Sequence, residues 1–291
     1  MSFLSLVRRY PRSLAAIAVL SLSATGLSLG GYDALAATLK SNFQARDATR
    51  YPQNPNLAPY GMKNIVVAYE NSLWPSGASK STPNASYILN SYIPKIKKQN
   101  PDVVVIDIEV WKLTPSMSSS QVTSVINKFK TVIGAFRKGL PKAKLGLYMG
   151  LPYRNWLAPC GDPKKRASRT TSWRNHNLRL RPLADSVDII FPSLYTFYSD
   201  SSSVKCWPTY ANANIKEARI YGKPVWGFLW MKYHKGGAWI PRTFWRTQLD
   251  ATYAGADGLV VWSKAGSDKW SWSAPWWLET KDFLADKQLA P

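Results

Sequence analysis

The sequence predicts a single α/β domain that folds as a distorted, TIM-like (β/α) barrel of seven strands over residues 63–291. Apolar, β-rich runs alternate with helical patterns from residue 63 onward, which is typical of a parallel sheet with helices outside it. Most of these runs are almost continuously apolar, as strands buried on both faces should be. About 250 residues follow a removable leader, a length that suits one such domain, and no internal repeat interrupts them.

The first 37 residues have the pattern of an export signal. Arg8, Arg9 and Arg12 precede an apolar run at 14–29, and small residues at 34–36 end the segment. We expect cleavage there, which makes the protein secreted or extracytoplasmic. An uncleaved membrane anchor is the alternative, although serine, threonine and glycine dilute the apolar run. The Arg8-Arg9 pair is also a weak indication of twin-arginine export.

The remaining elements follow in order along the chain. Residues 38–62 are polar and dotted with proline, which predicts an irregular lead-in. Six strands are then predicted at residues 65–69, 103–110, 145–149, 189–194, 225–230 and 259–262. Because six strands are too few for a regular eight-stranded barrel, we expect one or two more, with 71–84 as the candidate segment. The clearest helix is 119–138, where apolar residues recur at three- and four-residue spacing.

The charge of the chain limits its partners. The net charge is +21, and the leader holds only three of the basic residues. Such an excess favours a polyanion: an acidic polysaccharide, an anionic cell-wall polymer, a membrane surface or nucleic acid. Export makes nucleic acid the least attractive partner, and membrane contact is expected only through an uncleaved leader. The alternative is that the charge merely keeps the protein, which we expect to be a monomer, in solution.

Cysteine and histidine are scarce. Cys160 and Cys206 are the only cysteines, and a pair in an exported chain is more often a disulfide than a reactive site. His176 and His234 are the only histidines, and no cluster has the spacing of a zinc site. The sequence therefore predicts one disulfide and implies no metal.

Two carboxylates, Asp107 and Glu109, end the apolar run that begins at Val103. In parallel α/β folds the functional face lies at the carboxyl ends of the strands. A spacing of two puts both side chains on one side of a strand, with Cα atoms roughly 6.5 to 7 Å apart. Paired carboxylates suit glycoside hydrolysis, and their crowding raises one pKa so that a proton stays available. The alternative, ion pairs with lysine or arginine, is costly at the end of so apolar a strand.

The segment Val105-Ile-Asp-Ile-Glu-Val-Trp-Lys112 resembles the active-site strand of the animal and insect-venom hyaluronidases, which reads Ile-Asp-Trp-Glu-x-Trp-Arg. Four further segments are similar to that family, in the same order over residues 63–285. They are Leu145-Gly-Leu-Tyr-Met-Gly-Leu-Pro152, Phe191-Pro-Ser-Leu-Tyr195, Lys223-Pro-Val-Trp-Gly-Phe228 and Gly255-Ala-Asp-Gly-Leu-Val-Val-Trp262. Chitinase-like barrels also end a strand in Asp-x-Glu, but their pattern has another Asp where this chain has Val105.

The resemblance implies a secreted glycosidase that cleaves β-linked N-acetylhexosamine in a polysaccharide by a retaining, substrate-assisted mechanism, with no cofactor. Glu109 would be the general acid and base, and the substrate's own acetamido oxygen would attack the anomeric carbon. Asp107 would orient the acetamido group. Tyr195 and Tyr153 would contact the acetamido group or the distorted sugar, and Trp262 would form the floor of the pocket.

The chain also departs from the family. It lacks the longer insert between the first strand and the catalytic strand, and it has one cysteine pair where the family has more. The family's Asp-Cys-Tyr-Asn after the proline is here only Tyr153-Arg-Asn155. These changes alter the walls of the cleft and leave the identity of the glycan open.

Aromatic and basic residues are the remaining candidates for contact with a glycan. Aromatic rings offer flat faces to sugars, and those on or just beyond strand ends are expected to line the cleft. They are Trp111, Tyr148, Tyr195, Trp230 and Trp262. Basic residues between two strands either grip carboxylates of an acidic chain or form a solvated face. They are Lys164, Lys165, Arg166, Arg169, Arg174, Arg179 and Arg181.

Two other functions fit the same residues. A non-catalytic glycan-binding barrel would keep the aromatic residues and the charge, but an abandoned active site should tolerate loss of Asp107 and Glu109. A barrel hydrolase acting on cell-wall glycan, or on an anionic polymer linked to the wall, would need the same carboxylates and the same charge. Only a comparison of substrates separates this hydrolase from a hyaluronidase-like one.

Overall fold

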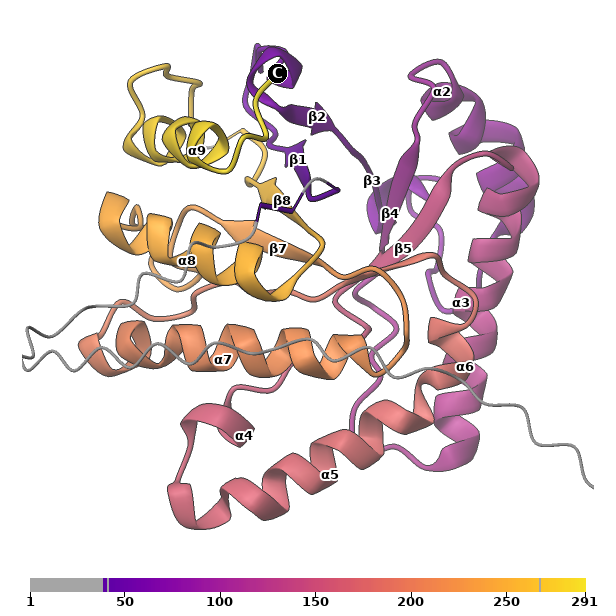
Figure 1. Cartoon of the computed structure of the whole chain (residues 1–291). Helices are drawn as coiled ribbons and strands as arrows, with labels where there is room; N and C mark the ends of the chain where they lie inside the picture. The colour runs from indigo at the N-terminus through magenta and orange to yellow at the C-terminus, as the bar shows by residue number, and fades with distance from the viewer. Residues whose placement is uncertain (1–38, 41, 267) are drawn as a thin grey trace, which may run out of the picture. The chain divides into compact units, whose positions relative to one another are not determined.

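Parallel strands form the centre of the computed structural model, which describes residues 39–40, 42–266 and 268–291 (Figure 1). Within these residues eight strands lie in two four-stranded sheets, ordered β2-β1-β8-β7 and β3-β4-β5-β6. The strands are β1 (Gln44–Ala48), β2 (Met62–Asn64), β3 (Val66–Tyr69), β4 (Val103–Asp107), β5 (Lys144–Tyr148), β6 (Ile189–Phe191), β7 (Trp226–Trp230) and β8 (Gly258–Trp262). Every ladder is parallel, so the predicted α/β class and the six predicted strands are confirmed.

The two sheets meet at β2 and β3, and again at β6 and β7. Only Ile65 separates β2 from β3, so these two strands are consecutive parts of one extended segment. If β2 and β3 are counted as one segment, the chain has seven extended segments, which is the number of strands predicted from the sequence. Isolated parallel bridges, Ile190 with Val225 and Ser193 with Phe228, join β6 to β7 in place of a continuous ladder. The two sheets are therefore joined only weakly at this edge.

Helices cover the outer faces of the strands. The long ones are α3 (Ser119–Gly139), α5 (Arg166–Arg179), α7 (Ser201–Arg219), α8 (Arg242–Gly255) and α9 (Pro275–Asp286). The short ones are α1 (Ala85–Tyr87), α2 (Ile93–Lys97), α4 (Leu157–Cys160) and α6 (Arg181–Ala184). α3 packs against β5 and α8 against β8, and α7 and α9 flank α8 (Figure 1).

The predicted helix at 119–138 is α3. Its first turn is closed by a reciprocal pair of hydrogen bonds in which the Ser118 side chain and the Gln121 side chain each accept a backbone N–H of the other. Its apolar residues, among them Val122, Ile126 and Phe129, are buried. The helix therefore presents one apolar face to the sheet, as its residue spacing predicts.

The expected irregular lead-in over 38–62 is wrong, because β1 lies within it and pairs with both β2 and β8. Its two charged residues are buried. The Arg46 guanidinium donates to both carboxylate oxygens of Asp102, at 2.9 and 2.7 Å, and Asp47 accepts from the N–H and hydroxyl of Thr49. Charged residues that are paired or hydrogen-bonded inside the protein can occupy a buried strand. This strand therefore has no apolar run from which it could be predicted. The expected strand within 71–84 is also wrong, since the described residues there form turns, a short 3-10 segment and bends.

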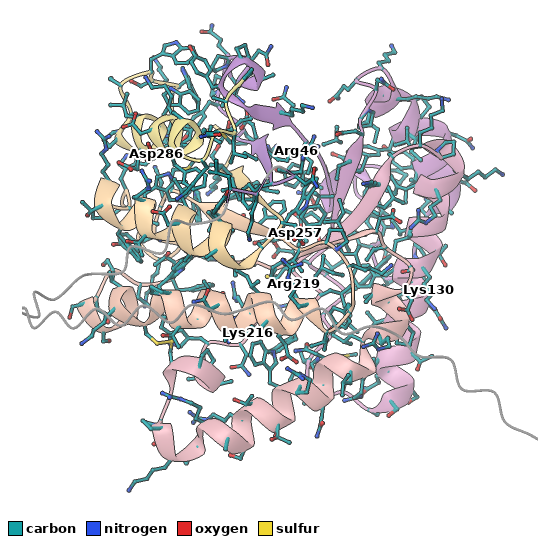
Figure 2. The ribbon with its side chains drawn as sticks, viewed as in Figure 1. Arg46, Lys130, Lys216, Arg219, Asp257 and Asp286 are labelled. Carbon is teal, nitrogen blue, oxygen red and sulfur yellow. A yellow bond between two sulfur atoms is a disulfide. The ribbon has the colours of Figure 1, made fainter. Side chains whose placement is uncertain are left out.

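Aspartates fix the amino ends of the strands. Asp188, before β6, accepts from the Leu145 N–H at 2.8 Å and from Arg137. Asp257, before β8, accepts from the Val225 N–H at 2.8 Å and pairs with Arg219 on α7 (Figure 2). These bonds hold neighbouring strands in register at one end of the sheets, and the opposite, carboxyl ends remain available for a site.

Cys160 and Cys206 form the predicted disulfide, with an S–S distance of 1.99 Å, and it joins α4 to α7. Residues Thr38–Pro291 make up one compact unit, and the predicted leader lies outside the residues that the structure describes. In the described chain no helix is both long and apolar enough to cross a membrane.

Candidate active site

A pocket of about 530 Å³ opens at the carboxyl ends of the strands. Its acidic wall is formed by Asp107 and Glu109. Its aromatic wall is formed by four of the residues predicted to line a cleft, Tyr148, Tyr195, Trp230 and Trp262. The main pocket, as we call it, therefore combines a carboxylate pair, which suits glycoside hydrolysis, with flat aromatic rings, which suit contact with sugars.

Asp107 is the last residue of β4 and lies opposite Tyr69 of β3. Its side chain is half-buried, and its Oδ1 atom is buried without a hydrogen-bond partner among the described residues. Burial, followed by the charges of Glu109 and Glu70, raises the pKa of Asp107 to about 7, against the opposing charge of Arg50. One carboxyl group of the site therefore keeps its proton close to neutral pH.

Glu109 lies on the turn after β4, because the strand predicted to reach residue 110 ends at Asp107. The N–H groups of Glu109 and Val110 donate to Glu70 Oε2 at 2.9 and 3.1 Å. Burial acts to raise the pKa of Glu70, but the hydrogen bonds from Lys80 and these two N–H groups outweigh it, and the pKa is lowered. An ionised Glu70 thus anchors the turn that presents the exposed Glu109 side chain to the pocket.

The aromatic wall is packed around Tyr195. Its ring stacks on Trp262 with centroids 5.6 Å apart and contacts Tyr148 and Trp230 at 5.8 and 5.7 Å. Burial raises the pKa of Tyr195 well above its ordinary value, so the phenol stays protonated. Trp262 Nε1 donates to the Tyr69 hydroxyl at 2.8 Å, which fixes its ring beside Asp107.

Trp111 and Tyr153 lie on a neighbouring pocket of about 370 Å³ that shares Glu109 with the main pocket. Trp111 is buried between Trp74 and Phe129, and its Nε1 donates to the Lys80 carbonyl at 2.7 Å. It therefore supports the turn of Glu109 from beneath. The Tyr153 N–H donates to Asn177 at 2.9 Å, and Tyr153 is not among the residues that line the main pocket.

Seven residues of the main pocket were not predicted as site residues from the sequence: Val67, Met149, Arg154, Phe197, Phe228, His234 and Lys264. Arg154, Phe197 and His234 form a stack in which the guanidinium lies 4.2 Å from the Phe197 centroid and the His234 ring 4.5 Å from it. Burial, and then the charge of Arg154, lowers the pKa of His234. The only signal in the sequence was that Arg154 stands where the chain departs from the family motif.

Four of the seven residues in the basic run after β5 make contacts within the fold, and Lys164 and Lys165 are exposed. Arg174 pairs with Glu217, and Arg169, Arg179 and Arg181 donate to backbone carbonyls. Arg166 is exposed and lies outside the pockets described here. In the described part of the chain, no group of three or more His, Cys, Asp or Glu side chains is arranged to hold a metal ion.

No protein-family model matches the sequence, and no curated protein matches it. Solved structures share its fold. Bee venom hyaluronidase is 18% identical and aligns over 85% of this chain and 98% of its own, with a TM-score of 0.57. The same enzyme in complex with a hyaluronic acid tetramer is 17% identical, over 85% and 97% of the two chains, with a TM-score of 0.56. The resemblance found in the sequence is thereby confirmed at the level of the fold.

Proposed function

We propose that this protein is a secreted glycoside hydrolase that cleaves β-linked N-acetylhexosamine in a polysaccharide. The observation that carries the proposal is the main pocket, where Asp107 and Glu109 face a wall built on Tyr195 and Trp262. The likeness in fold to bee venom hyaluronidase supports it. The disulfide between Cys160 and Cys206 is compatible with export.

The reaction is substrate-assisted and retains the configuration of the anomeric carbon. Glu109 donates a proton to the glycosidic oxygen while the acetamido carbonyl oxygen attacks the anomeric carbon and the bond to the leaving sugar breaks. The cyclic intermediate carries the positive charge that this step creates. Water then attacks the same carbon, Glu109 accepts its proton, and the acetamido group is restored.

The raised pKa of Asp107 allows the carboxyl pair to hold a proton. Because the pKa of Asp107 is about 7, the two carboxyl groups together hold a proton in mildly acidic solution. An acetamido N–H that donates to Asp107 favours the ionised form of this carboxyl group. The Asp107 carboxylate then stabilises the positive charge of the cyclic intermediate.

The pocket walls position the sugar. Trp262 offers a ring face to the C–H side of a pyranose ring, and the protonated Tyr195 hydroxyl can donate to the acetamido oxygen. The net charge of +21 favours an anionic polysaccharide as the partner, bound by a monomer outside the cytoplasm.

The test is release of reducing ends from hyaluronan, chondroitin, chitin oligomers and peptidoglycan by the protein lacking residues 1–37. We expect release from at least one polymer, and we expect Glu109→Gln to lower kcat by about 10²- to 10⁴-fold, the usual contribution of a general acid. Asp185→Asn removes an exposed carboxylate away from the pocket and should leave kcat unchanged.

The outcomes separate the candidate functions. Release from peptidoglycan alone would make the protein a hydrolase of cell-wall glycan. Binding of a glycan without any release would make it a glycan-binding barrel. Release that survives Glu109→Gln would contradict the mechanism.

A further inference from the structure

Arg154 lies where three pockets meet. It lines the main pocket, the neighbouring pocket of about 370 Å³, and a third pocket of about 330 Å³. The third pocket, called the aromatic side pocket below, is walled mainly by Trp156, Leu157, Phe197 and Tyr198. Phe197 also belongs to the main pocket, so these two pockets share one wall.

The shared wall is held by backbone contacts. The His234 N–H donates to the Thr196 carbonyl at 2.8 Å, and the Lys235 N–H donates to the Phe197 carbonyl at 3.0 Å. These bonds hold Phe197 where its ring contacts both the Arg154 guanidinium and the His234 ring. A few residues beyond Arg154, the disulfide of Cys160 ties α4 to α7. The guanidinium is therefore positioned before any ligand arrives, which reduces the entropy lost on binding.

The donors of Arg154 are not used by the fold. Arg46, Arg137 and Arg219 each pair with a carboxylate, whereas Arg154 makes no ion pair within the described residues. Stacking on Phe197 occupies a face of the guanidinium and leaves its N–H groups, which lie in the plane, free to donate. A half-buried cation without an anion is costly, and the planar fork fits a carboxylate with two parallel hydrogen bonds.

We propose that Arg154 is a specificity-determining residue that binds the carboxylate of an acidic sugar unit seated in the aromatic side pocket. The unit would be next to the hexosamine held at Asp107 and Glu109, so this proposal rests on the proposed function. The apolar rings of the side pocket suit the C–H face of a sugar, and the arginine supplies the charge. The shared chemistry of the ligand is a carboxylate-bearing saccharide, whether a uronate or a lactyl ether.

Binding measured without turnover tests the proposal. In a Glu109→Gln background, calorimetry would compare oligosaccharides of hyaluronan and of peptidoglycan glycan with the same compounds after methyl esterification of their carboxylates. We expect the ester to bind about 10- to 100-fold more weakly than the acid in at least one of the two series. The series that shows the difference identifies the source of the carboxylate.

Arg154→Met should remove that difference by weakening the acid about 10- to 100-fold while leaving the ester within about twofold. Arg154→Lys, which keeps the charge without the planar fork, should recover only part of the loss. Arg166→Met makes the same change in charge outside the three pockets and should leave the affinities for the acid and the ester unchanged.

The failure of this proposal differs from the failure of the proposed function. If acid and ester bind equally in both series, or if Arg154→Met weakens both to the same extent, Arg154 does not recognise a carboxylate, whatever the rate of hydrolysis. If the acid is preferred through Arg154 but no polymer is cleaved by the protein with Glu109 intact, the recognition is correct and the hydrolase assignment is wrong.

Discussion

Asp107 illustrates how the surroundings of one side chain set its chemistry. Its pKa is raised from 3.8 to about 7, so the folded protein favours the protonated form. The contribution of Asp107 to stability is therefore complete below its ordinary pKa and is lost as the pH rises through about 7. We expect Asp107→Asn to match the original protein at about pH 4 and to exceed its free energy of unfolding by about 2 kcal/mol at about pH 8. Urea denaturation at both pH values measures this.

Asp185→Asn is the matched control for this prediction, because Asp185 is exposed and the change in charge is the same. It should alter stability by no more than about 0.5 kcal/mol at either pH. Equal stabilities of Asp107→Asn and the original protein at about pH 8 would mean that Asp107 is solvated and ionised at no cost, contrary to its buried Oδ1 atom.

The carboxylate pair was predictable from the sequence, but the stack beside it was not. Asp107 and Glu109 stand out because charge at the end of a continuous apolar run is unusual. Arg154, Phe197 and His234 come from three separate loops and meet only through the path of the backbone. No periodic pattern encodes such a meeting, which depends on contacts between residues far apart in the chain.

At the scale of the elements, strands made of apolar runs were predicted correctly from the sequence, whereas the strand with buried polar residues was not. β4, β5, β7 and β8 were found because their residues are buried on both faces. β1 was missed because Arg46 and Asp47 occupy buried positions that apolar residues usually fill, and the partner of Arg46, Asp102, lies far along the sequence. A strand stabilised by buried polar contacts can be identified only when those partners are known.

The aspartates at the amino ends of the strands should contribute to stability with a pH dependence opposite to that of Asp107. Burial acts to raise the pKa of Asp257, but Arg219 and the Val225 N–H outweigh it and the pKa is lowered. Its contribution to stability is therefore present above its ordinary pKa and is lost as the pH falls through the lowered value. We expect Asp257→Asn to cost about 1 kcal/mol at neutral pH and almost nothing in strong acid, as measured by urea denaturation.

A stability difference for Asp257→Asn that grows in acid would contradict this account. Asp185→Asn again serves as the control for a simple loss of negative charge. The two aspartates, Asp107 and Asp257, should thus respond to pH in opposite directions, because the first is buried beside two carboxylates and the second is paired with an arginine.

At the scale of the whole molecule, charge separates into paired and unpaired groups. Most carboxylates of the described residues form ion pairs, including those on α8 and α9 that join Arg242 and Arg246 to Glu279. Within the described residues, the excess of positive charge is therefore carried largely by lysines and arginines outside these ion pairs. Such an excess attracts a polyanion over a distance of about 10 Å, and dissolved salt weakens that attraction.

The dependence of affinity on salt concentration should therefore distinguish the contribution of the surface charge from the contribution of Arg154. We expect the affinity of Glu109→Gln for long hyaluronan to fall about 10-fold or more between roughly 0.05 and 0.3 M NaCl, because the polymer contacts many exposed cations. A short acidic oligosaccharide touches the pockets alone, and Arg154 is half-buried there, so its affinity should fall much less. Calorimetry on both ligands measures this, with a neutral chitin oligomer as the control that should not respond. If the long polymer is as insensitive to salt as the neutral oligomer, the surface charge does not contribute to its capture.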